Sequence, residues 1–85
     1  MKSFTYTITD PLGLHARPAG LLVKAAAAYK SAVTVTAPSG KADAKRIMAV
    51  MRLAAKQGME LTVTCEGPDE DTACEGLKAF LAANL

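Results

Sequence analysis

The sequence predicts an α+β fold, a two-layer open-faced β-sandwich in which a four-stranded sheet is covered on one face by three helices. Three observations support this prediction. Four short segments alternate apolar residues with other residues, mostly threonine, which is the two-residue period of a half-buried strand. Three longer segments repeat apolar residues at helical spacing. The elements follow in the order β-α-β-β-α-β-α, so helices on a single face bury every apolar surface and leave the threonine face open to water.

The four strands are recognised by their alternation and by the turns that end them. They are predicted at residues 4–9, 33–36, 41–44 and 61–65. The first ends at residues 10–11, and the fourth is broken by glycine and proline at residues 67–68. A turn at residues 38–40 joins the second strand to the third. The low apolar content of the third strand marks it as an edge of the sheet.

The first and last helices each carry one apolar stripe. The first helix is predicted over residues 16–29, with the stripe Ala19, Leu22, Val23 and Ala26. The last helix follows Asp69, which we expect to cap it, and acidic residues crowd its positive end. Its stripe is Ala73, Leu77, Phe80 and Leu81. Both helices are therefore expected to pack on the sheet.

The second, shorter helix is less clearly patterned. Its predicted inward stripe is Ile47, Val50, Met51 and Ala54, and Gly58 is expected to close it as a left-handed C-cap. Met48 and Leu53 fall outside this stripe. Either they complete a wide buried face, or Met48 with part of Met51 forms an exposed apolar patch suited to binding partners. Spacing alone favours the buried alternative.

Length and composition exclude several classes of function. Eighty-five residues suffice for one modest core, so we expect residues 1–85 to form a single domain. A net charge of +2, few aromatic residues and no basic run give little support for nucleic-acid binding. No apolar run reaches membrane length and no signal peptide is recognised, so we expect a cytoplasmic protein without membrane insertion. Cys65 and Cys74 lack metal-binding spacing and are expected to be reduced thiols, with no metal or cofactor.

The only histidine lies at a predicted helix start. Gly13 ends a loop, His15 falls at the N-cap, and Pro18 lies in the first turn, where its missing N–H is tolerated. The unpaired donors nearest the cap are then the amides of Ala16 and Arg17. A neutral imidazole is a usable nucleophile, and a phosphoryl group on it would lie among two amides and the guanidinium of Arg17. The arrangement predicts a site that accepts an anion.

A lone histidine is more often a surface or core residue without a special role. Here, however, two residues are unfavourable at the start of a helix. His15 is a poor substitute for the usual N-cap residues, and the charge of Arg17 opposes the helix dipole unless an anion is bound. Together they favour the anion site over the ordinary structural interpretation.

Two separated motifs resemble those of one family. Residues 13–19 read GLHARPA and are similar to the active-site motif of the HPr phosphocarrier proteins of the bacterial phosphoenolpyruvate-dependent sugar phosphotransferase system. Residues 45–51 read KRIMAVM and resemble that family's second-helix signature. The resemblance implies an antiparallel sheet with strand order 1-4-2-3. It also implies that His15 accepts a phosphoryl group on Nδ1 from enzyme I and passes it to sugar-specific EIIA domains, as a stoichiometric carrier without turnover of its own.

The resemblance further implies a docking patch beside the histidine, formed by Ile47, Met48 and Met51. Arg46 adjoins this patch and stands where many family members carry a regulatory serine, so regulation by serine phosphorylation is not expected at this position. We expect a monomer that binds enzyme I and EIIA domains. Two alternative functions are an anion-binding module whose histidine is never phosphorylated and a hydrolase. The hydrolase is weakly supported, because the sequence contains no second acid, base or metal cluster.

Overall fold

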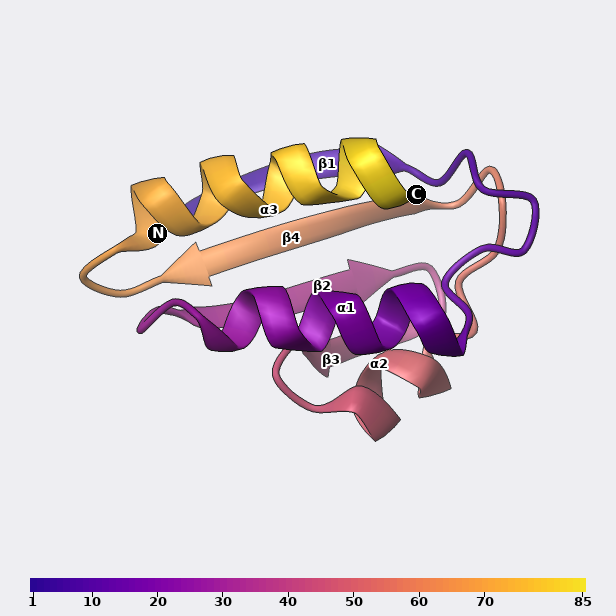
Figure 1. Ribbon diagram of the computed structural model, residues 1–85, viewed down its shortest axis with the longest axis horizontal. Helices are drawn as coiled ribbons and strands as arrows, with labels where there is room; N and C mark the ends of the chain where they lie inside the picture. Colours follow the sequence, from indigo (N-terminus) through magenta and orange to yellow (C-terminus); the bar gives the residue numbers. More distant parts are fainter.

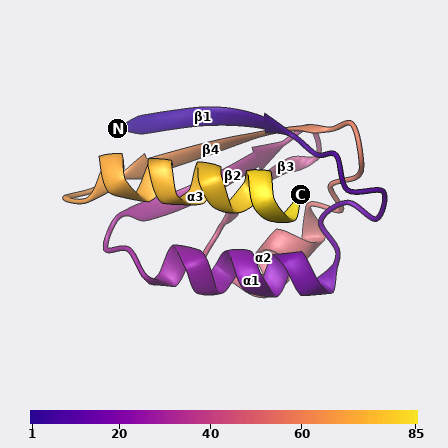
Figure 2. The same cartoon turned by 45° about the horizontal axis from the view of Figure 1, so that its top comes forward.

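The computed structural model describes residues 1–85 and contains four strands and three helices. In chain order the elements are β1 (Lys2–Thr7), α1 (Ala16–Ala27), β2 (Ala32–Ala37), β3 (Gly40–Asp43), α2 (Ile47–Arg52), β4 (Glu60–Glu66) and α3 (Glu70–Asn84). The strands form one antiparallel sheet in the order β1-β4-β2-β3. All three helices lie on one face of this sheet (Figure 1 and Figure 2). The predicted fold class and strand order are confirmed.

The register of the sheet separates its two faces. In the two central strands Val35 pairs with Val63 and Thr34 pairs with Thr64, so valines lie opposite valines and threonines opposite threonines. The valines are completely buried under the helices, whereas the threonines are half-buried on the open face. β3 pairs only with β2 and buries a single side chain, that of Ala42, as expected for an edge strand.

The core lies between the sheet and the helices. Small residues of α1 pack in this layer, since Ala19 and Ala26 are completely buried beside Leu22, and α1 lies next to both α2 and α3. α3 buries Ala73, Leu77 and Leu81, as predicted from its stripe. None of the helices is long and apolar enough to cross a membrane.

The predicted inward stripe of the second helix is wrong. Val50 is buried in α2, but Ile47 and Met51 are exposed to 41% and 39%, and Leu53 is buried just beyond the helix end. The prediction assumed a regular helix as far as residue 54, whereas α2 has only six residues. Because the chain leaves the helix at Leu53, that side chain turns into the core instead of following the helical repeat.

The predicted cap at Gly58 is also wrong. The left-handed residue after α2 is Ala54, with φ of 49°, and no other residue besides glycine has a positive φ. Gly58 has φ of 88° in the turn before β4, where its N–H donates to the carbonyl of Ile8 at 2.9 Å. Alanine in the left-handed region is strained by its Cβ. The segment between α2 and β4 therefore stores a small amount of backbone strain.

Replacing Ala54 by glycine is expected to increase stability. Relief of left-handed strain outweighs the extra freedom of glycine in the unfolded chain, which gives a gain of about 0.5 to 1 kcal/mol and an upward shift of roughly 2 to 8 °C in melting temperature. Thermal melts check this result. Ala79→Gly on the exposed surface of α3 is the control and is expected to lose about 1 kcal/mol. An Ala54→Gly protein that melts as low as Ala79→Gly would contradict the assignment.

Asp69 lies at the N-cap of α3 as predicted, but it does not cap the helix. Its side chain makes no capping hydrogen bond; it accepts the N–H groups of Lys30 and Ser31 at 2.9 and 2.8 Å, and the Ser31 hydroxyl. The hydroxyl of Ser31, with the N–H of Lys30, holds the pKa of Asp69 below its ordinary value. Asp69 therefore ties the start of α3 to the connection between α1 and β2.

Candidate functional site

The loop that carries His15 is fixed by backbone contacts. Gly13 is buried with φ of 67° and donates its N–H to the carbonyl of Asp10 at 2.9 Å. Leu14 is buried and donates its N–H to the carbonyl of Ala55 at 2.9 Å. A Cβ at position 13 would lie 2.8 Å from Cα of Lys56, so only glycine fits against the segment after α2. The loop is thus braced by a part of the chain about 40 residues away in sequence.

His15 lies at the N-cap of α1, as predicted. Its backbone is extended, with φ of −85° and ψ of −175°, and its carbonyl accepts the N–H of Ala19 at 3.0 Å. The imidazole makes no capping hydrogen bond, and α1 has no acidic residue in its first turn. The first-turn amides of Ala16 and Arg17 have no acceptor within the helix. A half-buried imidazole therefore stands beside free amide donors at the positive end of a helix.

A pocket of about 270 Å³ opens at His15. Its lining comes mostly from the start of α1 and the end of α3, and these two helix ends lie on the same side of the molecule (Figure 1 and Figure 2). The lining residues are Asp10, His15, Arg17, Pro18, Leu21, Ala83 and Asn84. The carbonyl of Leu85 accepts the N–H groups of Thr9 and Asp10 at 2.6 and 2.9 Å, which holds the start of the loop against the end of α3.

The structure brings His15, Arg17 and Pro18 together in the pocket, but sequence reasoning missed Asp10, Leu21 and Asn84. Asp10 carried a local signal, since it lies at the start of the same loop. Asn84 carried none, because the meeting of α3 with this loop is a tertiary contact across the whole length of the chain.

Arg17 is available for an anion. The three ion pairs of the structure join the N-terminal ammonium to Glu70, Lys2 to Asp71, and Arg46 to Asp43, so none of them uses Arg17. The guanidinium is exposed at the pocket and presents a planar set of donors that suits phosphoryl oxygens. No cluster of three or more metal-ligating side chains is found.

α2 presents apolar side chains to solvent beside α1. Met48 is 65% exposed, so the alternative that placed it in the core is wrong, and Ile47 and Met51 share its exposed surface. Ile47 lies near Gly20 of α1, because a Cβ at Gly20 would be 3.7 Å from Cδ1 of Ile47. The apolar surface of α2, defined here as Ile47, Met48 and Met51, therefore adjoins the helix that begins at the pocket.

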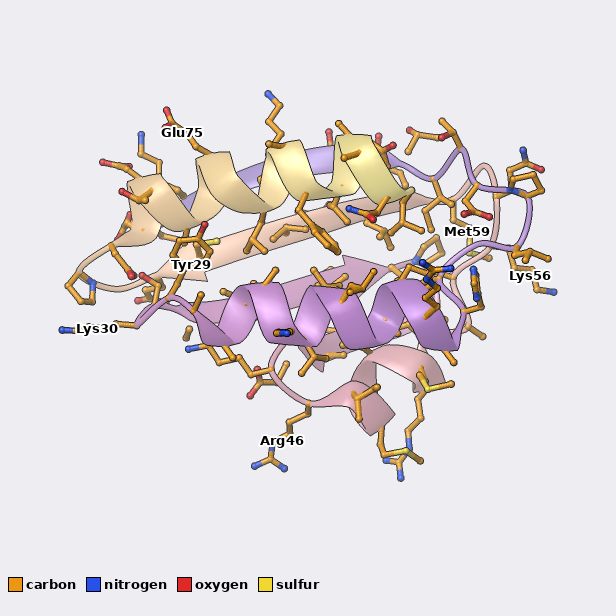
Figure 3. All side chains as sticks on the ribbon, viewed as in Figure 1. Tyr29, Lys30, Arg46, Lys56, Met59 and Glu75 are labelled. Carbon is orange, nitrogen blue, oxygen red and sulfur yellow. The ribbon has the colours of Figure 1, made fainter.

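Arg46 occupies the N-cap of α2 and makes no capping hydrogen bond. Its side chain extends away from the molecule (Figure 3) and is 80% exposed, with Nε 3.9 Å from the carboxylate of Asp43. An exposed pair at this distance contributes little to stability. Arg46 thus places an exposed positive charge at the edge of the apolar surface of α2.

The two cysteines are free thiols, as expected. Cys65 is completely buried in β4 and Cys74 is partly buried in α3. Burial, together with the neighbouring thiol of Cys74, raises the pKa of Cys65 to about 12. The Cys65 thiol is therefore protonated at neutral pH and packs as a small apolar side chain.

The family of the chain follows from comparison with known proteins. Residues 2–83 match the family described as "PTS HPr component phosphorylation site". The chain belongs to the HPr family. It is an HPr-type phosphocarrier protein, and the resemblance seen in the two sequence motifs is confirmed.

Individual HPr proteins resemble the chain over nearly its whole length. Phosphocarrier protein HPr of Lysinibacillus sphaericus is 47% identical over 81 residues, which are 95% of this chain and 92% of the relative. The structure of a histidine-containing phosphocarrier protein of Mycoplasma has a TM-score of 0.93 at 39% identity, covering 96% of this chain and 93% of that one. An HPr dimer from Thermoanaerobacter tengcongensis has a TM-score of 0.77 at 37% identity, covering 98% and 95%.

Proposed function

We propose that His15 accepts a phosphoryl group from phosphorylated enzyme I and passes it to EIIA domains during sugar uptake by the phosphotransferase system. The observation that carries this proposal is the free imidazole at the start of α1, in one pocket with the unpaired guanidinium of Arg17. A histidine that neither caps its helix nor supports the core is available for covalent chemistry.

The proposed step is an in-line displacement. Nδ1 of His15 forms a bond to phosphorus while the bond between phosphorus and the donor atom of enzyme I breaks, and the proton on the other nitrogen of His15 stays in place. The leaving atom of enzyme I keeps the electron pair of the broken bond. Arg17 and the amides of Ala16 and Arg17 stabilise charge on the equatorial oxygens, and Pro18 fixes the first turn that presents these amides. We propose a stoichiometric carrier that uses no metal or cofactor.

Docking of both partners is assigned to the apolar surface of α2, with Arg46 at its rim. Exposed methionines adapt to more than one partner, which suits a protein that must bind a donor and an acceptor in turn. Arg17, Arg46 and Arg52 add positive charge to the α1 and α2 surface, so we expect acidic partner surfaces. One copy of the chain contains the complete pocket, so we propose that the protein acts as a monomer. We also propose that it acts in the cytoplasm.

Arg46 also affects whether the chain can be regulated by phosphorylation at residue 46. Its side chain is exposed at the position where the family's regulatory serine stands, but a guanidinium offers no hydroxyl for an ATP-dependent serine kinase. We therefore propose that this chain carries phosphoryl groups through His15 without control by phosphorylation at residue 46.

Incubation with phosphoenolpyruvate and enzyme I is expected to add one acid-labile phosphoryl group at His15. Intact-mass measurement and peptide mapping check the number and position of the group. His15→Ala should abolish the modification, because no other imidazole is present. A native protein that stays unmodified beside a competent reference HPr would overturn the carrier proposal and favour an anion-binding module.

A further inference from the structure

Asp10 brings a negative charge into a pocket otherwise suited to an anion. It lines this pocket together with His15 and Arg17. Its Oδ1 accepts the N–H of Leu12 at 2.8 Å, and its own N–H donates to the carbonyl of Leu85 at 2.9 Å, so the residue is held in place from two sides. Neither Asp10 nor Arg17 takes part in an ion pair. The charge of Asp10 is therefore not neutralised by a fixed cation and acts on whatever occupies the pocket.

The local backbone does not need this charge. The hydrogen bond from Leu12 closes a short turn in which the side chain serves as an acceptor, and asparagine or serine can accept the same bond. A neutral residue would preserve the turn and would repel an incoming phosphoryl group less. The local fold therefore gives no reason for a charged side chain at position 10.

We infer that the Asp10 carboxylate destabilises the phosphorylated form of His15 and so raises the tendency of this protein to pass the phosphoryl group on. The inference rests on the proposed function. The amides and Arg17 favour a bound phosphoryl group, and a carboxylate in the same pocket opposes it, since like charges disfavour each other. A carrier has to release the group as readily as it accepts it. Asp10 shifts that balance toward release.

The test measures the equilibrium between phosphoenolpyruvate and the carrier. Each variant is incubated with catalytic enzyme I at fixed ratios of phosphoenolpyruvate to pyruvate, and the phosphorylated fraction is read by intact mass. Asp10→Asn is expected to raise the equilibrium constant for phosphorylation about threefold to tenfold, the size of a like-charge repulsion in a pocket open to water. Asn84→Asp adds a carboxylate to the α3 wall of the pocket and should lower the same constant.

Glu75→Gln is the matched control. It removes the same charge from an exposed side chain of α3 that lies at the opposite end of the molecule from Lys56 and Met59, near which the His15 loop is braced (Figure 3). Its equilibrium constant should equal that of the native protein. Thermal melts show whether each variant is folded, and Asp10→Ser replaces Asp10→Asn if the latter is not.

The outcomes separate the two proposals. A native protein that is never phosphorylated at His15 overturns the proposed function and the role of Asp10 with it. A native protein that is phosphorylated, with the same equilibrium constant in Asp10→Asn, in Glu75→Gln and in the native chain, overturns the role of Asp10 alone. Opposite shifts in Asp10→Asn and Asn84→Asp support it, because a purely structural effect would not change sign with charge.

Discussion

Gly13→Ala is expected to destabilise the protein by about 3 to 5 kcal/mol, with a fall in melting temperature of roughly 12 °C or more. Two effects add at this position. The left-handed φ of 67° strains any residue with a Cβ, and the added methyl group would collide with the backbone of Ala55 and Lys56. Backbone atoms cannot move aside as a flexible side chain can. The loop would have to leave its bracing segment, so the folded fraction should also accept phosphoryl groups more slowly.

Gly58→Ala is the control for this experiment. Gly58 is also left-handed, with φ of 88°, but no atom lies within 4 Å of a Cβ added there. Gly58→Ala should therefore lose only about 1 to 2 kcal/mol, the cost of left-handed strain alone. Urea and thermal unfolding of both variants measure the difference. Equal losses in the two variants would show that the contact with the segment after α2 does not support the loop.

Met48→Glu is expected to lower kcat/KM for phosphoryl acceptance from enzyme I by about tenfold or more, because a partner that covers Met48 would have to bury a charge. The fold should tolerate the change. Met48 is 65% exposed, and a carboxylate in the first turn of α2 interacts favourably with the helix dipole, so stability should stay within about 0.5 kcal/mol of the native value. Transfer assays and melts on the same samples separate binding from folding.

Ala79→Glu supplies the comparison for Met48→Glu. It adds the same charge to an exposed site on α3, outside the apolar surface of α2, and should leave phosphoryl transfer nearly unchanged. If Met48→Glu instead lowers the melting temperature in step with the transfer rate, Met48 belongs to the core of the protein and the docking surface must be assigned elsewhere.

Local patterns predicted the parts of the structure that are determined locally. Alternating residues located the strands, and the arrangement of Gly13, His15 and Pro18 placed the histidine at the start of α1. Both predictions depend on residues within a few positions of one another. This is also why His15 and Arg17 were predicted to act together at one anion site, and the structure places both side chains in one pocket.

The features that the sequence did not predict depend on contacts between residues far apart in the chain, which local sequence patterns do not report. Ala54 gives no sequence signal for a left-handed conformation, so the end of α2 was misplaced, and Leu53 and Met48 were grouped together although only Leu53 is buried. A distant contact also explains Gly76, which is unfavourable in a helix: a Cβ there would occupy the space of the Tyr29 side chain, from the segment just after α1. The wall of the pocket formed by Asn84 likewise depends on how α3 meets the loop after β1.

The position of β4 in the sheet has a consequence for the synthesis of the chain. β4 begins at residue 60 and lies between β1 and β2, so neither of these strands has its full set of partners until about three-quarters of the polypeptide exists. Before that point only α1, the short α2 and the β2–β3 hairpin can form from neighbouring residues, and a two-stranded hairpin is marginal by itself. β1 must stay unpaired while the intervening segments are translated. Ser3, Thr5 and Thr7 keep one side of β1 polar before β4 is made, which limits its pairing with other nascent chains.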